Sequence, residues 1–173
     1  MRKYIIIAAR GILIAAIIFW MMTIFGFSAQ DAEASQSTSD IITGKIIETF
    51  VDNYDDMSAA SQRELWDKIS FVVRKVGHFG EYGILGGLIF LLMITFEKVR
   101  KNYKWLILEL VVCAAYASTD EFHQGFVAGR SPMIRDVFID TAGAFTAVVI
   151  SLCIWHFILK RFVMPEKMKE ANN

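Results

Sequence analysis

Four long apolar runs constrain this chain more than any other feature of its sequence. They lie at residues 4–27, 77–96, 105–119 and 132–159. A helix needs about 20 apolar residues to cross the hydrocarbon core of a bilayer, and the hydrophobic fraction of 55% is high for a soluble domain. Because every backbone N–H and C=O inside a bilayer must be paired within the protein, such runs form helices. The sequence therefore predicts an all-α membrane protein with four transmembrane helices.

Two more polar segments lie between the first and second runs. Residues 41–54 and 61–76 repeat apolar side chains at helical spacing and are too polar to span a membrane. We expect them to form two extracytoplasmic amphipathic helices that lie on the outer leaflet or over the bundle. With the four spans they make a single integral membrane domain that covers residues 1–173.

Local signals predict where several helices begin. Residues 28–40 are small and polar and predict a loop, so Ser39 or Asp40 is the expected N-cap of the helix that follows. Residues 61–64 have the pattern of a capping box, which predicts a second helix start. Residues 131–132 are a Ser-Pro pair, which favours the start of the fourth transmembrane helix at this point.

The distribution of basic residues predicts the orientation in the membrane. The N-terminus, the connection 97–104 and the tail 160–173 are basic, whereas acidic residues outnumber basic ones in residues 28–74. We therefore expect a multi-pass protein with both termini in the cytoplasm. The first apolar run exceeds the length of a signal peptide's apolar region, so it predicts an anchor.

Polar side chains gather near those ends of the apolar runs that are predicted to face outward. Ionisable groups in a spanning segment are costly and indicate a functional site by default. Helical spacing puts Lys75, His78 and Tyr82 on one face of a helix, and Asp136 and Asp140 on one face of another. The whole set is Lys75, His78, Glu81, Tyr82, Asp120, Glu121, Gln124, Arg130, Asp136 and Asp140.

Three other polar residues lie toward the opposite side of the membrane. Arg10 is expected to extend from the first run to the inner headgroups. Glu109 follows Lys104 by about one turn, and His156 precedes Lys160 by about one turn. We expect both to lie at the inner interface and outside the site.

A stripe of glycines marks the second run. Gly80, Gly83 and Gly87 follow one another at steps of three and four, so they share one face of the helix. Small residues in this pattern let two spanning helices approach closely. We expect this face to be a seam between packed helices.

The polar set predicts either acid–base chemistry or anion binding. The catalytic candidates are His78, Asp120, Glu121 and Asp136. The substrate-binding candidates are Lys75, Glu81, Tyr82, Gln124, Arg130 and Asp140. Among them, the cations Lys75 and Arg130 would hold an anion.

Two alternatives explain the same residues without a reaction. In the first, they form a salt-bridge network between helices, and Asp140 pairs with Arg130 or Lys75. In the second, they hold a metal ion, for which the available donors are His78, Glu81, Asp120, His123 and Asp136. No ligand spacing such as HExxH occurs, so we expect no metal and no other cofactor.

Four short motifs are similar to those of a known family. They are residues 27–30 with the serine-rich stretch after them, residues 75–79 with Glu81 and Tyr82, residues 118–124, and residues 129–130 with residues 135–137 and Gly143. Together they resemble the VanZ-like family of small bacterial membrane proteins, in the family's order and over most of the chain. Asp140 stands where this family often has Asn, and Ala128 where it commonly has Pro. The resemblance implies a bacterial cell membrane and a link to teicoplanin resistance, through the accessory protein of glycopeptide-resistance clusters that names the family.

The sequence leaves two functional hypotheses. In the first, a polar pocket at the outer leaflet binds an anionic lipid-anchored precursor of the cell envelope or a lipoglycopeptide antibiotic. If the protein is an enzyme, the same pocket modifies this molecule. In the second, the protein is a non-enzymatic membrane scaffold or binding protein whose polar cluster is structural. Membrane lipids are the expected partners in both hypotheses, and nucleic acid is not.

Overall fold

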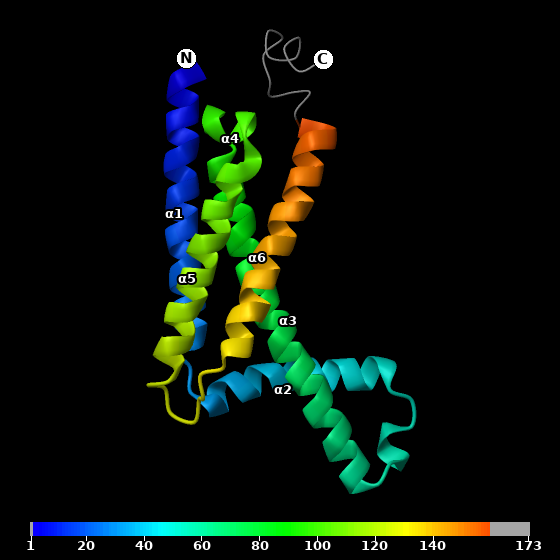
Figure 1. The fold of residues 1–173 in the computed structure, drawn as a ribbon. Coiled ribbons are helices and arrows are strands. Elements are labelled where there is room, and N and C mark those ends of the chain that lie inside the picture. The colour runs from blue at the N-terminus through cyan, green and yellow to red at the C-terminus, as the bar shows by residue number, and fades with distance from the viewer. Residues whose placement is uncertain (1, 160–173) are drawn as a thin grey trace.

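A computed structural model describes residues 2–159, and every regular element in this part of the chain is a helix (Figure 1). The helices α1, α3, α5 and α6 pack side by side, whereas α2 lies across one end of the bundle. This arrangement confirms the all-α prediction. The elements are α1 (Arg2–Ser28), α2 (Ala32–Phe50), η1 (Tyr54–Asp56), α3 (Ala59–Met93), α4 (Glu97–Lys101), η2 (Tyr103–Trp105), α5 (Leu106–Gln124), α6 (Ile134–Ile154) and η3 (Trp155–Leu159).

Three helices in the described part of the chain are long and apolar enough to cross a membrane. These candidate spans are Lys3–Ser28, Ala59–Met93 and Ile134–Phe157. They fit the prediction of a membrane protein. The third predicted run, 105–119, forms most of α5, whose acidic residues lower its hydropathy. Its role as a fourth span therefore depends on how those residues are packed.

The segment 28–40 is largely helical, so the prediction of a loop there is wrong. Asp31 is the N-cap of α2, and its side chain accepts a hydrogen bond from the backbone N–H of Ala34 at 2.8 Å. The serine and threonine side chains that favour loops bond back to the helix instead, as Ser39 does to the carbonyl of Ser35 at 3.1 Å. Both expected caps consequently lie inside the helix.

The second amphipathic segment and the second apolar run form one continuous helix, α3, of 35 residues. Two separate helices were predicted there. No proline interrupts residues 59–93, so the backbone hydrogen bonds continue from the outer segment into the bundle. Ser58 is the N-cap and accepts from the backbone N–H of Ser61 at 3.2 Å, which starts the helix before the predicted capping box.

Polar contacts attach α2 to the first half of α3. The Asp40 carboxylate accepts from Trp66 Nε1 at 3.0 Å and from Gln36 Nε2 at 2.7 Å. Gln36 also donates to the Ser70 hydroxyl at 3.0 Å and accepts from the Arg74 guanidinium. This network holds α2 across the end of the bundle and positions Arg74.

α6 begins at Ile134, two residues after the predicted Ser-Pro start. Met133 occupies the N-cap position and supplies no side-chain hydrogen bond. The Glu121 carboxylate on α5 accepts from the backbone N–H of Met133 at 2.7 Å. A carboxylate from a neighbouring helix therefore replaces the local cap, and its negative charge suits the N-terminal end of the helix dipole.

The backbones of α3 and α6 approach each other closely at several glycines. A Cβ atom added to Gly86 would lie 2.9 Å from Cα and O of Ala144, and one added to Gly83 would lie 3.6 Å from the carbonyl oxygen of Gly143. A Cβ on Gly143 would overlap the backbone of Phe79. Glycine is required at positions 86 and 143 because a side chain there would clash with the neighbouring helix, whereas a Cβ on Gly83 would make an ordinary contact.

The predicted glycine seam is therefore right for Gly83 and wrong for its other two members. Cβ atoms added to Gly80 or Gly87 would meet nothing within 4 Å. Gly86, one position away on the helix, faces α6 instead of Gly87. Spacing alone could not show which side of the glycine-rich helix meets its neighbour.

At the end of the bundle opposite α2 lie the start of α1, α4 and the end of α6 (Figure 1). Arg10 donates to the side chain and carbonyl of Thr95 at 2.8 and 3.0 Å, and its guanidinium lies 3.9 Å from the centre of the Phe96 ring. It thus binds the turn that follows α3, and its expected extension to the inner headgroups stays a prediction. The basic tail 160–173 lies outside the described residues.

Glu109 is fully buried between helices and lines neither of the two cavities at the α2 end of the bundle, and its place at the inner interface stays a prediction. Both of its carboxyl oxygens lack a hydrogen-bond partner in the described part of the chain. His156 is exposed and packs edge-on against Phe157. The α5 face that carries Glu109 turns toward the interior because Cys113 and Ala117, one and two turns further along, are also buried there.

Candidate functional site

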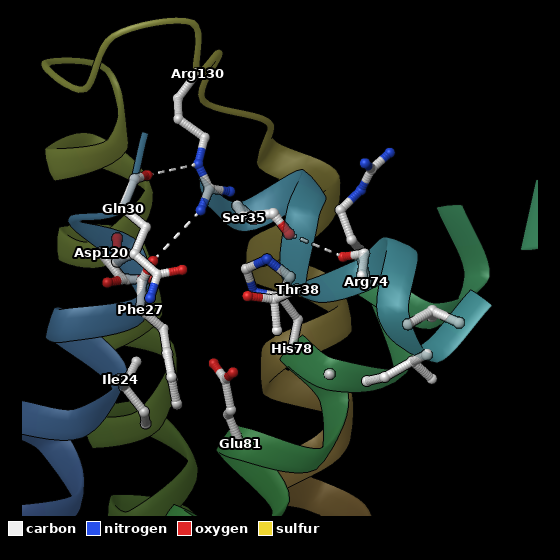
Figure 2. Close-up of a pocket in the computed structure, with 15 residues that line it drawn as sticks. Ile24, Phe27, Gln30, Ser35, Thr38, Arg74, His78, Glu81, Asp120 and Arg130 are labelled. Atoms are coloured by element: carbon white, nitrogen blue, oxygen red, sulfur yellow. Dashed lines mark hydrogen bonds between the residues drawn. The ribbon is translucent and has the colours of Figure 1, made fainter. Parts of the chain in front are cut away.

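A cavity of about 210 Å³ lies where the end of α1, α2, α3 and α5 meet (Figure 2). Side chains from α3 and from the loop after α5 face it. Its polar walls include Ser35, Arg74, His78, Glu81, Asp120 and Arg130. Four of these residues, His78, Glu81, Asp120 and Arg130, were predicted as site residues from the sequence.

A second cavity of about 320 Å³ adjoins the first. Its walls include Lys75, Gln124, Arg135 and Asp136. Arg74, His78 and Arg130 line both cavities, so they form the wall that the two share. The two cavities therefore act as two parts of one site.

Lys75 and Asp136 form a close ion pair between α3 and α6. Lys75 Nζ lies 2.6 and 2.7 Å from the two carboxylate oxygens of Asp136. The side chains are 18% and 9% exposed. Each charge is thus neutralised by the other, which leaves Asp136 less free for the catalytic role that was proposed from the sequence.

His78 and Asp140 also face each other across α3 and α6. His78 Nδ1 lies 3.4 Å from Asp140 Oδ1, and the Asp140 side chain is fully buried. The pairing of Asp140 with Arg130 or Lys75 that the alternative hypothesis required is therefore wrong. With Nδ1 directed at a buried carboxylate, the opposite ring nitrogen, Nε2, is the one left for the cavities.

The two acidic residues near the end of α5 have different surroundings. Asp120 lines the first cavity and accepts a long hydrogen bond from Gln124 Nε2 at 3.4 Å. Glu121 is bonded to the backbone of Met133 and belongs to the wall of a separate, mainly apolar hollow between α5 and α6. Adjacent residues on a helix point about 100° apart, which is why only one of the two reaches the cavity.

Tyr82 likewise lies away from the cavities. It is fully buried in the apolar core, and its ring packs against that of Tyr116 at 6.1 Å. The hydroxyl has no hydrogen-bond partner within residues 2–159. The structure therefore brings seven of the ten predicted residues to the walls of the two cavities. Asp140 is buried behind His78, and Tyr82 and Glu121 lie elsewhere.

Arg130 reaches from the loop after α5 to the end of α1 (Figure 2). Its guanidinium donates to the backbone carbonyls of Gln30 and Phe27 at 3.3 and 3.4 Å. Arg74 donates to the neutral side chain of Gln36, and Arg135 lies over the Phe71 ring. Among the described residues, none of these three arginines has a carboxylate oxygen within 4 Å.

Sequence reasoning missed Arg74 and the contribution of α2. Arg74, His78 and Glu81 follow at i, i+4 and i+7, so their common helix face could have been read from the sequence. The sequence analysis placed Lys75 on one face with His78 and did not include Arg74. From α2, the first cavity is lined by Ser35, Thr38 and Ser39. Because a loop was predicted for this segment, these side chains were not expected on one helix face.

In the described part of the chain, no group of three His, Cys, Asp or Glu side chains is arranged to hold a metal ion. Two of the five donors proposed for a metal make other contacts. Asp136 binds Lys75, and His123 packs against the Phe25 ring with 4.5 Å between ring centres. The chemistry available to the cavities is that of arginines, one histidine and carboxylates.

The family model described as VanZ/LLP1 matches residues 13–157. The chain belongs to the VanZ/LLP1 family. This match confirms the resemblance carried by the four motifs, all of which lie within it. No curated protein and no solved structure matches the chain.

The VanZ/LLP1 motifs all fall at the α2 end of the bundle. Residues 27–30 end α1, and residues 75–82 lie in the part of α3 that faces the cavities. Residues 118–124 form the last turns of α5, and residues 129–137 lead into α6. The motifs by which the family was recognised therefore coincide with the candidate site.

Proposed function

We propose that this VanZ/LLP1 protein binds the anionic head group of a lipid-anchored molecule at the outer face of the bacterial cell membrane. The observation that carries the proposal is the set of arginines Arg74, Arg130 and Arg135, which line the cavities without a carboxylate partner within residues 2–159. A guanidinium offers a planar fork of donors that suits phosphate or carboxylate oxygens. Charges left without an acidic partner favour an anionic ligand.

The composition of the cavity walls supports an amphiphilic ligand. The first cavity is lined by Ile24, Phe27, Ile42 and Val73 in addition to its polar groups. The second is lined mainly by charged and polar side chains. An apolar chain next to an anionic head group would match both parts of the site.

We include α5 as a fourth transmembrane helix in this proposal. It packs beside α6 and α1, and its acidic residues Glu109, Asp120 and Glu121 are buried. Because these groups do not face lipid, the helix can cross the membrane despite its charge. α2 and the first half of α3 would then be the two outer amphipathic elements.

The outward orientation of the site rests on the distribution of basic residues. The connection 97–104, which includes α4, is basic and lies at the end of the bundle opposite α2. Basic connections favour the cytoplasm, so the cavities would open to the outer leaflet. There the ligand would be a lipid-anchored cell-envelope precursor or a lipoglycopeptide, and the protein would contribute to teicoplanin-type resistance, as the family name suggests.

A structural scaffold is the second candidate function. It is favoured by polar contacts that join helices to each other, namely the ion pair of Lys75 with Asp136 and the hydrogen bond of Glu121 with the Met133 backbone. A scaffold needs no unpaired cations, however, and within residues 2–159 the arginines of the cavities have none of the acidic partners that a closed network would provide. The two functions differ in what neutralising an arginine should do.

The test measures retention of lipids by the purified full-length protein with native mass spectrometry. Dioleoyl phosphatidic acid and farnesyl phosphate should be retained, and the zwitterionic dioleoyl phosphatidylcholine should not. Arg74→Gln and Arg130→Gln should each reduce retention at least about tenfold, because a charge-assisted hydrogen bond contributes about 1.5–3 kcal/mol. Arg63→Gln is the control, since Arg63 is exposed near the start of α3. Equal retention of all three lipids, or unfolding in place of lost binding, would favour the scaffold.

A further inference from the structure

We propose that the head group is a phosphate monoester and that His78 activates water to hydrolyse it, with Asp140 as the positioning residue. The inference deepens the proposed function and rests on it. Its starting point is that the one histidine shared by both cavities faces a fully buried carboxylate. A structural histidine would not need to lie in the wall between two cavities.

The arrangement of His78 and Asp140 suits a general base. His78 Nδ1 lies 3.4 Å from Asp140 Oδ1, and neither atom has a hydrogen-bond partner among the described residues. If the carboxylate holds the imidazole proton on Nδ1, the lone pair of Nε2 is free to take a proton from water. Hydrogen bonds of this kind are often long before substrate binds. Asp140 is 0% exposed, so it does not reach the cavity and acts through the imidazole.

Two arginines stand next to this base. Arg74 and Arg130 line the same two cavities as His78. Phosphoryl transfer depends on positive groups that neutralise the nonbridging oxygens, and two guanidinium groups can bind them. Lys75 is bound to Asp136 and is therefore not the group that we assign to the phosphate.

Glu81 supplies the second group that hydrolysis needs. It lies one turn after His78 on α3, and its half-buried side chain faces the first cavity (Figure 2). The backbone carbonyl of Glu81 accepts a hydrogen bond from Trp20 Nε1. The carboxyl group remains to protonate a leaving alcohol.

In the proposed step, water oxygen forms a bond to phosphorus while the bond from phosphorus to the lipid oxygen breaks. His78 Nε2 takes a proton from the water, and Glu81 gives a proton to the leaving oxygen. The products are a lipid alcohol and inorganic phosphate. Proton exchange with solvent returns His78 and Glu81 to their starting states, so no oxidant, reductant or further reactant is required.

The test uses purified full-length protein with dioleoyl phosphatidic acid or farnesyl phosphate, in separate arms that distinguish a glycerolipid from an isoprenoid. Released inorganic phosphate and retained lipid are both measured. Release in either arm is the expected result. His78→Ala should lower kcat about 100-fold or more while lipid is retained, and His78→Gln serves as a second variant if the first does not fold. His156→Ala is the matched control, since His156 is exposed at the other end of the bundle.

The positioning role of Asp140 has its own readout. Asp140→Asn keeps an oxygen acceptor for Nδ1 and loses the charge, so kcat should fall about tenfold, because hydrogen bonds to an ionised group are roughly twice as strong as neutral ones. KM and lipid retention should not change. In the His78→Ala background the same change should have no further effect, because two residues that act as a unit are not additive. Additive losses would overturn the role of Asp140.

The outcomes separate this inference from the function on which it rests. Lipid retained by the wild-type protein without phosphate release overturns hydrolysis and leaves the binding function intact. Neither retention nor release overturns both. Phosphate release that persists in His78→Ala and His78→Gln overturns the assignment of His78.

Discussion

Lys75 donates from one helix to both carboxylate oxygens of Asp136 on another, with Nζ 2.6 and 2.7 Å from them. The pair joins the middle of α3 to the first turn of α6. Both charges are close to neutralised, so this contact stabilises the bundle beside the site. Arg74 and Arg130, by contrast, donate to neutral groups, so under the proposed function their charge is available to an anionic ligand.

Breaking that pair should destabilise the protein. Lys75→Met leaves Asp136 without its cation, and we expect the free energy of unfolding to fall by about 3 kcal/mol. Lys75→Met combined with Asp136→Leu should recover most of the loss, because no unpaired charge remains. Thermal unfolding in detergent measures both. Lys68→Met, in an exposed pair with Glu64, should leave the unfolding midpoint unchanged, and a loss there equal to that of Lys75→Met would contradict the argument.

The contact of α3 with α6 predicts opposite effects for two neighbouring glycines. Gly86→Ala should lower the free energy of unfolding by about 1–3 kcal/mol, because its Cβ would lie 2.9 Å from backbone atoms of Ala144. Gly87→Ala should be neutral or stabilise by up to about 1 kcal/mol, since a Cβ there meets nothing within 4 Å and alanine favours helix. Chemical unfolding of the two variants compares them directly. Equal destabilisation would show that the helices do not pack in this register.

Arg130 and Asp140 should differ in what they stabilise. Arg130→Ala removes two long hydrogen bonds in a loop, and we expect a loss of stability below about 1 kcal/mol together with weaker retention of phosphatidic acid. Asp140→Ala removes the fully buried carboxylate that lies 3.4 Å from His78 Nδ1, and should cost about 1–3 kcal/mol because His78 is left without its nearest acceptor. Thermal unfolding and lipid retention are measured on the same samples. Equal unfolding of both variants would make Arg130 structural.

Glu109 should limit the stability of the bundle. Its carboxyl group is fully buried and both oxygens lack a partner among the described residues. Because an unsatisfied polar group costs about 1–3 kcal/mol when buried, Glu109→Leu should raise the free energy of unfolding by a similar amount. Lipid retention should be unchanged, since Glu109 does not line either cavity. A lower unfolding temperature would indicate that Glu109 has a partner that stabilises it.

The orientation can be tested with single cysteines in a background that lacks Cys113 and Cys153. Asp56, Ser131 and Asn102 are all exposed and lie in connections. Cysteines at Asp56 and Ser131 should react with a membrane-impermeant thiol reagent on intact cells, whereas one at Asn102 should react only after the membrane is opened. Labelling of Asn102 from outside would reverse the topology and move the site to the cytoplasm.

Local physical chemistry was enough to predict much of the architecture. Long apolar runs have few stable forms in a membrane, which is why the helices of the four runs could be expected. Convergence of polar groups at one end followed from their depth along those runs. The ends of the helices were harder to predict from the sequence. Asp31 starts α2 earlier than the expected caps Ser39 and Asp40, and Glu121 replaces the expected cap of α6.

The sequence by itself determined the class of the protein, its family motifs and the residues that could carry a site. Only the tertiary structure decided which of them meet, because the rotation of each helix depends on packing between helices and not on spacing within one. Rotation of α3 brings Gly86 against α6 and Arg74 into the cavities, while that of α5 separates Asp120 from Glu121. The pairing of His78 with Asp140 arises in the same way, since two residues 62 positions apart meet when α3 and α6 pack closely at their glycines.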